Sequence, residues 1–148
     1  MQLTSAEVRK TFTDMWPDLE YIWLFDRKNW LCLSVEELSK MLKASRIPGM
    51  DWIDEFNDCD DFAMQFLSEA RRKQYFAYKR GNIARNIRIP LAMFNGFGNL
   101  FRGMDMLHMV NPAICDDRKI YFVDATPQAK RVWKADTDND NLLFVSSV

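Results

Sequence analysis

The chain has little cysteine, glycine and proline, and only one histidine. Its 148 residues include three Cys, five Gly, five Pro and one His. The cysteines, Cys32, Cys59 and Cys115, form an odd count without a close pair, which excludes a disulfide framework and zinc-finger spacing. Neither GxGxxG nor Gly-Lys-Ser/Thr occurs, so a phosphate-binding loop has no support. The sequence is therefore neither a small disulfide scaffold nor an evident nucleotide binder.

An excess of charge of one sign is also missing, as is any long apolar run. Lys and Arg number 20 against 21 Asp and Glu, for a formal net charge of −1. This balance lacks the electrostatic signature of nucleic-acid binding, so we expect no nucleic-acid partner. No apolar run reaches transmembrane length, and no N-terminal hydrophobic segment precedes a cleavage site. We therefore expect no membrane partner and a cytoplasmic location.

The composition that remains is that of an ordinary globular protein. Hydrophobic residues make up 48% of the chain and charged residues 28%, which are typical shares. A chain of this length is large enough for a real core, so we expect one domain over residues 1–148. The sequence says nothing about the oligomeric state.

Local patterns predict a mixture of helices and strands. Helices are expected where capping signals precede an apolar face: from about 4 to 15, from 34 to 45, and from 60 to 73 or beyond. Strands are expected where β-branched and aromatic residues cluster: at 21–25, 30–33, 83–93, 106–114, 119–124 and 142–145. A turn is expected at 26–29 and a mobile loop at 95–99. The two strands at 106–114 and 119–124 form the clearest predicted hairpin.

The most informative stretch is residues 57–63, which read NDCDDFA. Asn57 or Asp58 can cap the helix that the following apolar residues indicate, so Cys59 falls in its first turn. Free N–H groups and the helix dipole favour a thiolate there. The flanking carboxylates oppose this, because nearby negative charge raises the pKa of a thiol. A thiol in this position calls for a nearby cation, either a metal ion or a protonated side chain.

His108 and Asp124 supply the other two groups that a cysteine nucleophile needs. A histidine must take the thiol proton, and a third polar group must orient the imidazole. His108 lies in the first strand of the predicted hairpin and Asp124 ends the second. With a turn centred near residue 116 the two lie almost opposite each other. Asn111 is the alternative orienting residue, although it points to the other strand face.

A second acidic cluster, residues 136–141, reads DTDNDN and resembles the start of an EF-hand loop. It has Asn141 where that loop needs Gly, and Ser147 where it needs the bidentate Glu. We therefore interpret it as a solvated turn.

The motifs resemble the papain-like domain at the C-terminus of the mushroom galactose-binding agglutinin, and still more closely its small stand-alone phage relatives. The resemblance rests on DCDDFA at 58–63, HMVN at 108–111, and Val123-Asp124 with Pro127-Gln128 following. It implies an α+β fold with a papain-like cysteine hydrolase core, in which a helix packs on an antiparallel β-sheet. It also implies that Cys59 is the nucleophile, His108 its base and Asp124 the orienting acid.

The resemblance further implies a divalent cation beside the cysteine. The proteolytic member of the family depends on Ca²⁺ or Mn²⁺, bound partly by the aspartates around its cysteine. Carried over, Asp58, Asp60 and Asp61 become metal candidates, and Gln128 a further ligand. Carboxylate oxygens are the ligands that hard cations prefer, and a cation would offset the acidic cluster beside the thiolate.

Together these observations predict a thiol-dependent hydrolase of cysteine-peptidase type. We expect it to cleave an amide bond in a protein or peptide, to depend on a divalent metal, and to be phage-encoded, in the host cytoplasm or the virion. Two alternatives stay open. One is a peptidoglycan amidase or endopeptidase with the same chemistry. The other is a non-catalytic phage protein, either a virion component or an inhibitor of a host system, built on a degenerate papain-like fold.

Overall fold

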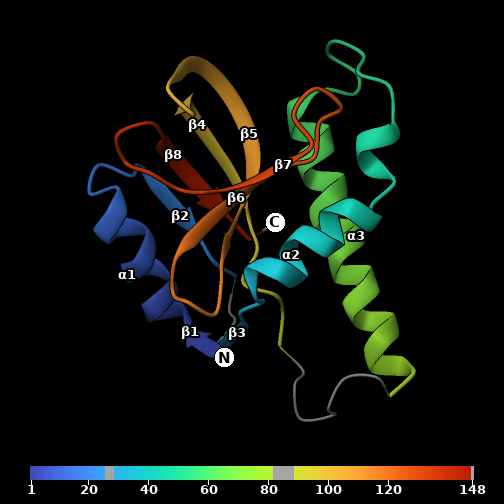
Figure 1. Ribbon diagram of the computed structural model, residues 1–148. Coiled ribbons are helices and arrows are strands. Elements are labelled where there is room, and N and C mark those ends of the chain that lie inside the picture. Colours follow the sequence, from blue (N-terminus) through green and yellow to red (C-terminus); the bar gives the residue numbers. More distant parts are fainter. Residues whose placement is uncertain (26–28, 82–88, 148) are drawn as a thin grey trace.

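The computed structural model describes residues 1–25, 29–81 and 89–147. Within these residues the α-helices are α1 (Ser5–Met15), α2 (Val35–Ala44) and α3 (Cys59–Lys79), with a short 3-10 helix at Ile47–Gly49. Figure 1 shows α1 on one side of the large sheet and α2 and α3 on the other. The predicted mixture of helices and sheet is therefore confirmed, with the sheet as the dominant part.

The described strands form one sheet of two strands and one of six. They are β1 (Gln2–Thr4), β2 (Tyr21–Trp23), β3 (Asn29–Leu31), β4 (Asn95–Phe101), β5 (Met104–Ile114), β6 (Ile120–Asp124), β7 (Arg131–Lys134) and β8 (Asn141–Ser146). The large sheet has the order β2-β8-β4-β5-β6-β7. Its neighbours are antiparallel except for β2 and β8, which run parallel, so the sheet is not purely antiparallel as predicted.

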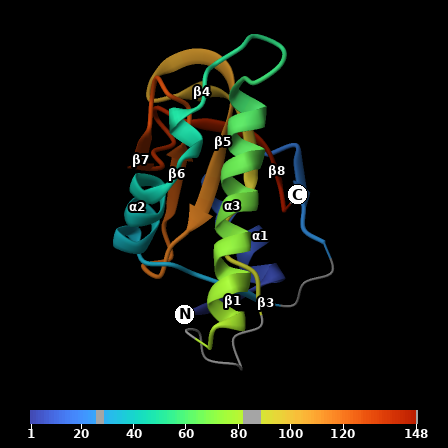
Figure 2. The ribbon, with the colours of Figure 1, turned by 90° about the vertical axis from the view of Figure 1, so that its right-hand side faces the viewer.

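Apolar cores lie on both faces of the large sheet. Val110 and Ile114 of β5 point into the core shared with α1, whereas Ala113 points into the core shared with α2 and α3. This alternation follows from the two-residue period of a strand. Figure 2 shows α3 running along β5, with its first turn at the same end of the molecule as the β4–β5 turn. That placement brings the start of α3 close to the beginning of β5.

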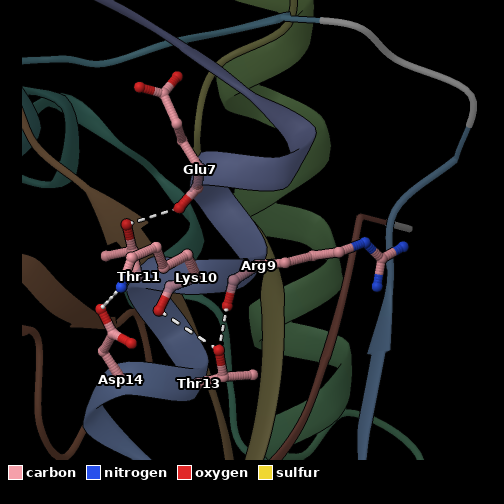
Figure 3. A network of polar contacts seen from close by, with 6 residues as sticks. All are labelled: Glu7, Arg9, Lys10, Thr11, Thr13 and Asp14. Carbon is pink, nitrogen blue, oxygen red and sulfur yellow. Dashed lines mark hydrogen bonds and ion pairs between the residues drawn. The ribbon is translucent and has the colours of Figure 1, made fainter.

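Helix α1 illustrates how local sequence defines a helix on the surface. Thr4 and Glu7 form a capping box at its start, where the sequence predicts a helix to begin. The Thr11 hydroxyl donates to the Glu7 carbonyl at 2.7 Å, and Lys10 forms an ion pair with Asp14 at 2.7 Å (Figure 3). An exposed ion pair such as Lys10–Asp14 contributes only about 0.3–0.5 kcal/mol to stability. The helix is held mainly by the apolar face that it turns to the sheet.

The segment at 95–99, expected to be a mobile loop, is instead part of β4. Its glycines lie where neighbouring strands approach closely. A Cβ at Gly96 would lie 2.8 Å from the ring of Pro112, and one at Gly98 would meet the Asn141 carbonyl and the Phe101 ring. The glycines therefore indicate close packing inside the sheet rather than a loop.

Other boundaries agree with those expected or differ more modestly. Helix α3 runs to Lys79, in agreement with the expectation that it reaches residue 73 or beyond. Residues 26–28 of the predicted turn and 83–88 of a predicted strand lie outside the described residues. Beyond them, Leu91 and Met93 make isolated bridges to Leu31 and Ala113 rather than a continuous strand. No helix in the described ranges is both long enough and apolar enough to cross a membrane.

Candidate functional site

Cys59 is the first residue of α3, in the helical turn where the sequence placed it. Asp58 is the N-cap, and its backbone N–H donates to the Asp61 carboxylate at 3.2 Å as part of a capping box. The Cys59 side chain is half-buried. The unpaired N–H groups of this first turn place positive partial charge around the thiol sulfur.

His108 and Asp124 meet across β5 and β6. Asn111 pairs with Val123, so the same register places Asp124 opposite Val110, two residues from His108. The contact is therefore diagonal rather than direct, because the hairpin turn lies slightly further along the chain than predicted. His108 Nε2 nevertheless lies 2.7 Å from Asp124 Oδ2. The side chains are buried, with His108 7% and Asp124 4% exposed.

Thr126 holds the Asp124 carboxylate in place. Its backbone N–H and its hydroxyl both donate to Asp124 Oδ1, at 3.0 and 2.7 Å. Burial by itself raises the pKa of Asp124, but the hydrogen bond and charge of His108 and the two bonds from Thr126 outweigh it and hold that pKa below its usual value. We missed Thr126 from the sequence, although an Asp followed two residues later by Thr is a recognisable turn signal.

The His108 ring faces both a carboxylate and a thiol. Burial alone lowers the pKa of His108, but hydrogen bonds to Asp124 and Cys59 and the negative charge of both groups raise it to about 9. Because Nε2 faces Asp124, Nδ1 is the ring nitrogen left for the Cys59 sulfur. An imidazolium in contact with a thiol stabilises the thiolate. His108 therefore provides the nearby cation that the setting of Cys59 calls for.

Asn111, the alternative orienting residue, makes its contacts elsewhere. It is fully buried. Its amide N–H groups donate to the carbonyls of Ala63 and Phe94, at 2.9 and 3.0 Å, and lie 3.0 Å from Asn95 Oδ1. Asn111 therefore joins α3 to the sheet, and the residue that contacts the His108 ring is Asp124.

The predicted metal ligands are only partly brought together. Ligand atoms of Asp58, Cys59 and Asp60 lie within 4.8 Å of one another. The pKa of Asp60 is raised by a hydrogen bond with Asp58, by burial, and by the charges of Asp58 and Asp61. Asp61 lies outside this group because its carboxylate serves the capping box. Gln128 lines the same cleft as Asp58 and Cys59.

That cleft has a volume of about 510 Å³. Cys59, His108 and Asp124 line it, together with Met104, Met106 and Leu107 of β5. The first three of these side chains, with Asp58, therefore open onto a space with one apolar wall, large enough for a small organic ligand.

The comparisons with known proteins identify a fold but no family. Neither the scan against protein-family models nor the search of curated proteins found a match. Two solved structures resemble the chain over 98% of its length. The "PSL1a-E64 complex" has a TM-score of 0.65 and 21% identity, with 51% of that chain covered. The other is Polyporus squamosus lectin bound to the human-type influenza-binding epitope Neu5Acα2-6Galβ1-4GlcNAc, with a TM-score of 0.67, 23% identity and 49% of its chain covered.

The chain thus spans about half the length of the solved chains that it matches. At these identities the likeness establishes a shared fold. Both structures are of a mushroom galactose-binding agglutinin, so this part of the predicted resemblance is confirmed. They provide no phage relative and no papain-like protein.

The predicted function is corrected by the same comparisons. The neighbours are structures of a lectin, one of them with a sugar epitope, and they point to carbohydrate rather than to a protein or peptide. The predictions of a cysteine peptidase, of its peptidoglycan and non-catalytic phage alternatives, and of a protein or peptide partner are therefore wrong. The physical reason is that three side chains can define a nucleophile without defining what it acts on.

Proposed function

We propose that this protein binds a ligand in the cleft beside Cys59 and captures it covalently through an activated thiol. The observation that carries the proposal is the contact chain from Cys59 through His108 to the Asp124 carboxylate. The proposed reaction is addition to an electrophilic carbon, without hydrolytic turnover. The papain-like placement of the cysteine helix against the histidine strand is part of this proposal.

Each residue has a definite part in such a capture. The Asp124 carboxylate accepts a hydrogen bond from the Nε2–H of His108, and Thr126 donates to the other oxygen of that carboxylate. The imidazolium stabilises the Cys59 thiolate at the start of α3. When the thiolate opens an epoxide, for example, a carbon–sulfur bond forms and a carbon–oxygen bond breaks. The His108 imidazolium then gives its Nδ1 proton to the released oxygen.

The rate of alkylation of Cys59 tests the proposal. Iodoacetamide is applied across a pH series to wild type and His108→Ala, and each cysteine is followed by mass spectrometry. Burial raises the pKa of Cys32 to about 11 and that of Cys115 to about 12, so these thiols serve as slow internal controls. We expect Cys59 to react rapidly well below the ordinary thiol pKa of about 8.5, and this advantage to disappear in the variant. A Cys59 rate that rises only near that pKa, and is indifferent to His108, would contradict the proposal.

E64 provides a second probe, because one neighbour is a complex with it. We expect a covalent adduct of E64 on Cys59, formed more slowly in His108→Ala. An adduct on Cys32 or Cys115, with Cys59 unmodified, would count against the cleft as the site of capture.

Carbohydrate binding in the same cleft is a second candidate, favoured by the sugar epitope on the other neighbour. Trp52 lines the cleft and is 36% exposed. Its ring stacks on Phe62, and its indole N–H donates to Asp54 at 2.7 Å, so its orientation is fixed. An apolar ring face beside polar groups suits a sugar, which has both kinds of surface.

Calorimetric titration with Neu5Acα2-6Galβ1-4GlcNAc tests this second candidate. We expect binding that is lost in Trp52→Ala and kept in Trp23→Ala, a matched change at an exposed indole on β2. No heat of binding, or a loss confined to Trp23→Ala, would argue against a sugar site at Trp52.

A divalent cation, Ca²⁺ or Mn²⁺, is part of the proposed site. The donor set fits it in part: Asp58 and Asp60 provide two clustered carboxylates beside Cys59, and Gln128 provides an amide in the same cleft. When bound, the ion would supply positive charge against the acidic cluster. We also propose that residues 1–148 form a single domain. The proposed location is the cytoplasm or a virion, and the proposed relatives include phage proteins.

A further inference from the structure

Arg102 is a cation in the wall of the cleft that contains Cys59 and His108. It lies in the turn between β4 and β5, and its guanidinium carbon is 5.0 Å from the centre of the Trp133 ring. In the part of the chain that the structure describes, no carboxylate lies within ion-pair distance of Arg102. Its buried Nε also has no hydrogen-bond partner there. Arg102 thus carries a charge that its described surroundings do not neutralise.

The backbone of Arg102 is held in an unusual conformation. Its φ is 52°, in the left-handed region that side chains other than glycine avoid. The Arg102 N–H donates to Asp140 Oδ1 at 2.9 Å, which stabilises that conformation. Gly103, the other residue of this two-residue turn, also has a positive φ of 77°, as the tight hairpin between β4 and β5 requires.

Asp140 positions both Arg102 and the ring beneath it. Its side chain is fully buried. Besides the Arg102 N–H, the carboxylate accepts the Trp133 indole N–H at 3.3 Å and the Asp136 backbone N–H at 2.8 Å. One buried carboxylate therefore aligns the Arg102 backbone with the indole on which its guanidinium rests. The acidic segment interpreted as a solvated turn thus contains a buried anchor.

We infer that Arg102 binds a carboxylate of the ligand that Cys59 captures. This inference rests on the proposed thiol nucleophile. A guanidinium presents paired N–H donors that match a carboxylate, and stacking on Trp133 holds them in one orientation. Asp58 and Asp60 repel an anion from the other side of Cys59, so the ligand's carboxylate is directed towards Arg102. Met104 and Met106 then face the apolar part of the ligand.

Two thiol reagents that differ only in charge test this assignment. 4-Maleimidobutyric acid and its amide add to thiols through the same ring, and their rates at Cys59 are measured by mass spectrometry. We expect the ratio of acid to amide rates to fall about tenfold in Arg102→Gln, as for the loss of one charge-assisted hydrogen bond. Arg102→Lys should retain part of the preference. Arg46→Gln, which removes an exposed arginine outside the cleft, should leave it unchanged.

An unchanged ratio in Arg102→Gln, with an unchanged amide rate, would overturn the inference.

A second experiment separates binding from thiol reactivity. It uses Cys59→Ala with the unreactive 4-succinimidobutyric acid and its amide. Binding is then followed through the NMR signal of the Trp133 indole N–H. We expect the acid to shift this signal and the amide to leave it unchanged. Adding the Arg102→Gln change should remove the shift caused by the acid. Equal shifts from both compounds, or none, would overturn the assignment of Arg102 even if Cys59 proves reactive. A shift with the acid alone would support it even if Cys59 proves inert.

Discussion

Asp124 Oδ2 and His108 Nε2 lie 2.7 Å apart on neighbouring strands, in a diagonal contact rather than a direct cross-strand pair. Thr126 donates two hydrogen bonds to the other carboxylate oxygen. The imidazole therefore has one fixed partner at Nε2, and the ring nitrogen that remains is directed to Cys59. The thiol reactivity proposed for the cleft depends on this one contact.

The protonation of His108 is the most direct test of the contact. Because His108 is the only histidine, its ring protons can be followed by NMR without ambiguity. We expect wild type to titrate with a pKa of about 9. Asp124→Asn removes a hydrogen bond to the charged ring and a negative charge, so that pKa should fall towards the ordinary 6.5. Asp117→Asn, at an exposed turn, is the matched control. Equal titrations in wild type and Asp124→Asn would show that the carboxylate does not stabilise the imidazolium.

Stability should decline as the pH rises above neutrality. The folded-state pKa of His108 lies above its ordinary value, so its contribution is fully present below pH 6.5 and is lost as the pH passes through about 9. We expect the free energy of unfolding in urea to fall by about 1–3 kcal/mol over that window. His108→Gln should remove most of the decline. A slope that persists in the variant would assign it to other groups.

The acidic side of the stability profile has the opposite sign. The pKa of Asp124 is lowered in the folded protein, so its contribution is present above the ordinary value of 3.8 and is lost as the pH falls below it. We expect Asp124→Asn to be less sensitive than wild type to unfolding between pH 4 and pH 2. Parallel urea midpoints for both proteins across this range would contradict the expectation.

Asn111 should matter for stability and not for the thiol. Asn111→Ala leaves the buried carbonyls of Ala63 and Phe94 without this donor. The Ala63 carbonyl keeps its hydrogen bond within α3, so the variant loses bonds without leaving every acceptor unpaired. Because losing hydrogen bonds to buried groups costs about 1–3 kcal/mol, the free energy of unfolding should fall by about that amount. The rate of Cys59 alkylation in the folded variant should match wild type. A large loss of rate without a loss of stability would instead make Asn111 the orienting residue.

Calcium or manganese should stabilise the protein through Asp58 and Asp60. An ion that binds only the folded state raises the melting temperature with its concentration. We expect a rise of a few degrees at millimolar ion, lost in Asp60→Asn. Asp18→Asn, which removes an exposed carboxylate far from the cysteine in sequence, should behave as wild type. A melting temperature indifferent to both ions would remove the metal from the proposed site.

Features set by residues close together in the chain were predictable from the sequence, and features set by strand pairing were not. The capping box at Ser34 and the start of α3 at Cys59 were predictable because they depend on residues within one helical turn. The hairpin of β5 and β6 was predictable from its alternation, but its register was not, because a small change in the turn moves every opposing pair. Gly96 and Gly98 misled the prediction, because a glycine in a loop and one in a crowded strand look alike.

By itself, then, the sequence determined the helix start that presents Cys59, the strands that carry His108 and Asp124, and the acidic setting of the thiol. Those features follow from local capping, alternation and charge. Only the tertiary structure decided that Asp124 rather than Asn111 contacts the histidine, and that Asp140 aligns Arg102 with Trp133. Each of these depends on distances between strands, which no periodicity in the chain encodes.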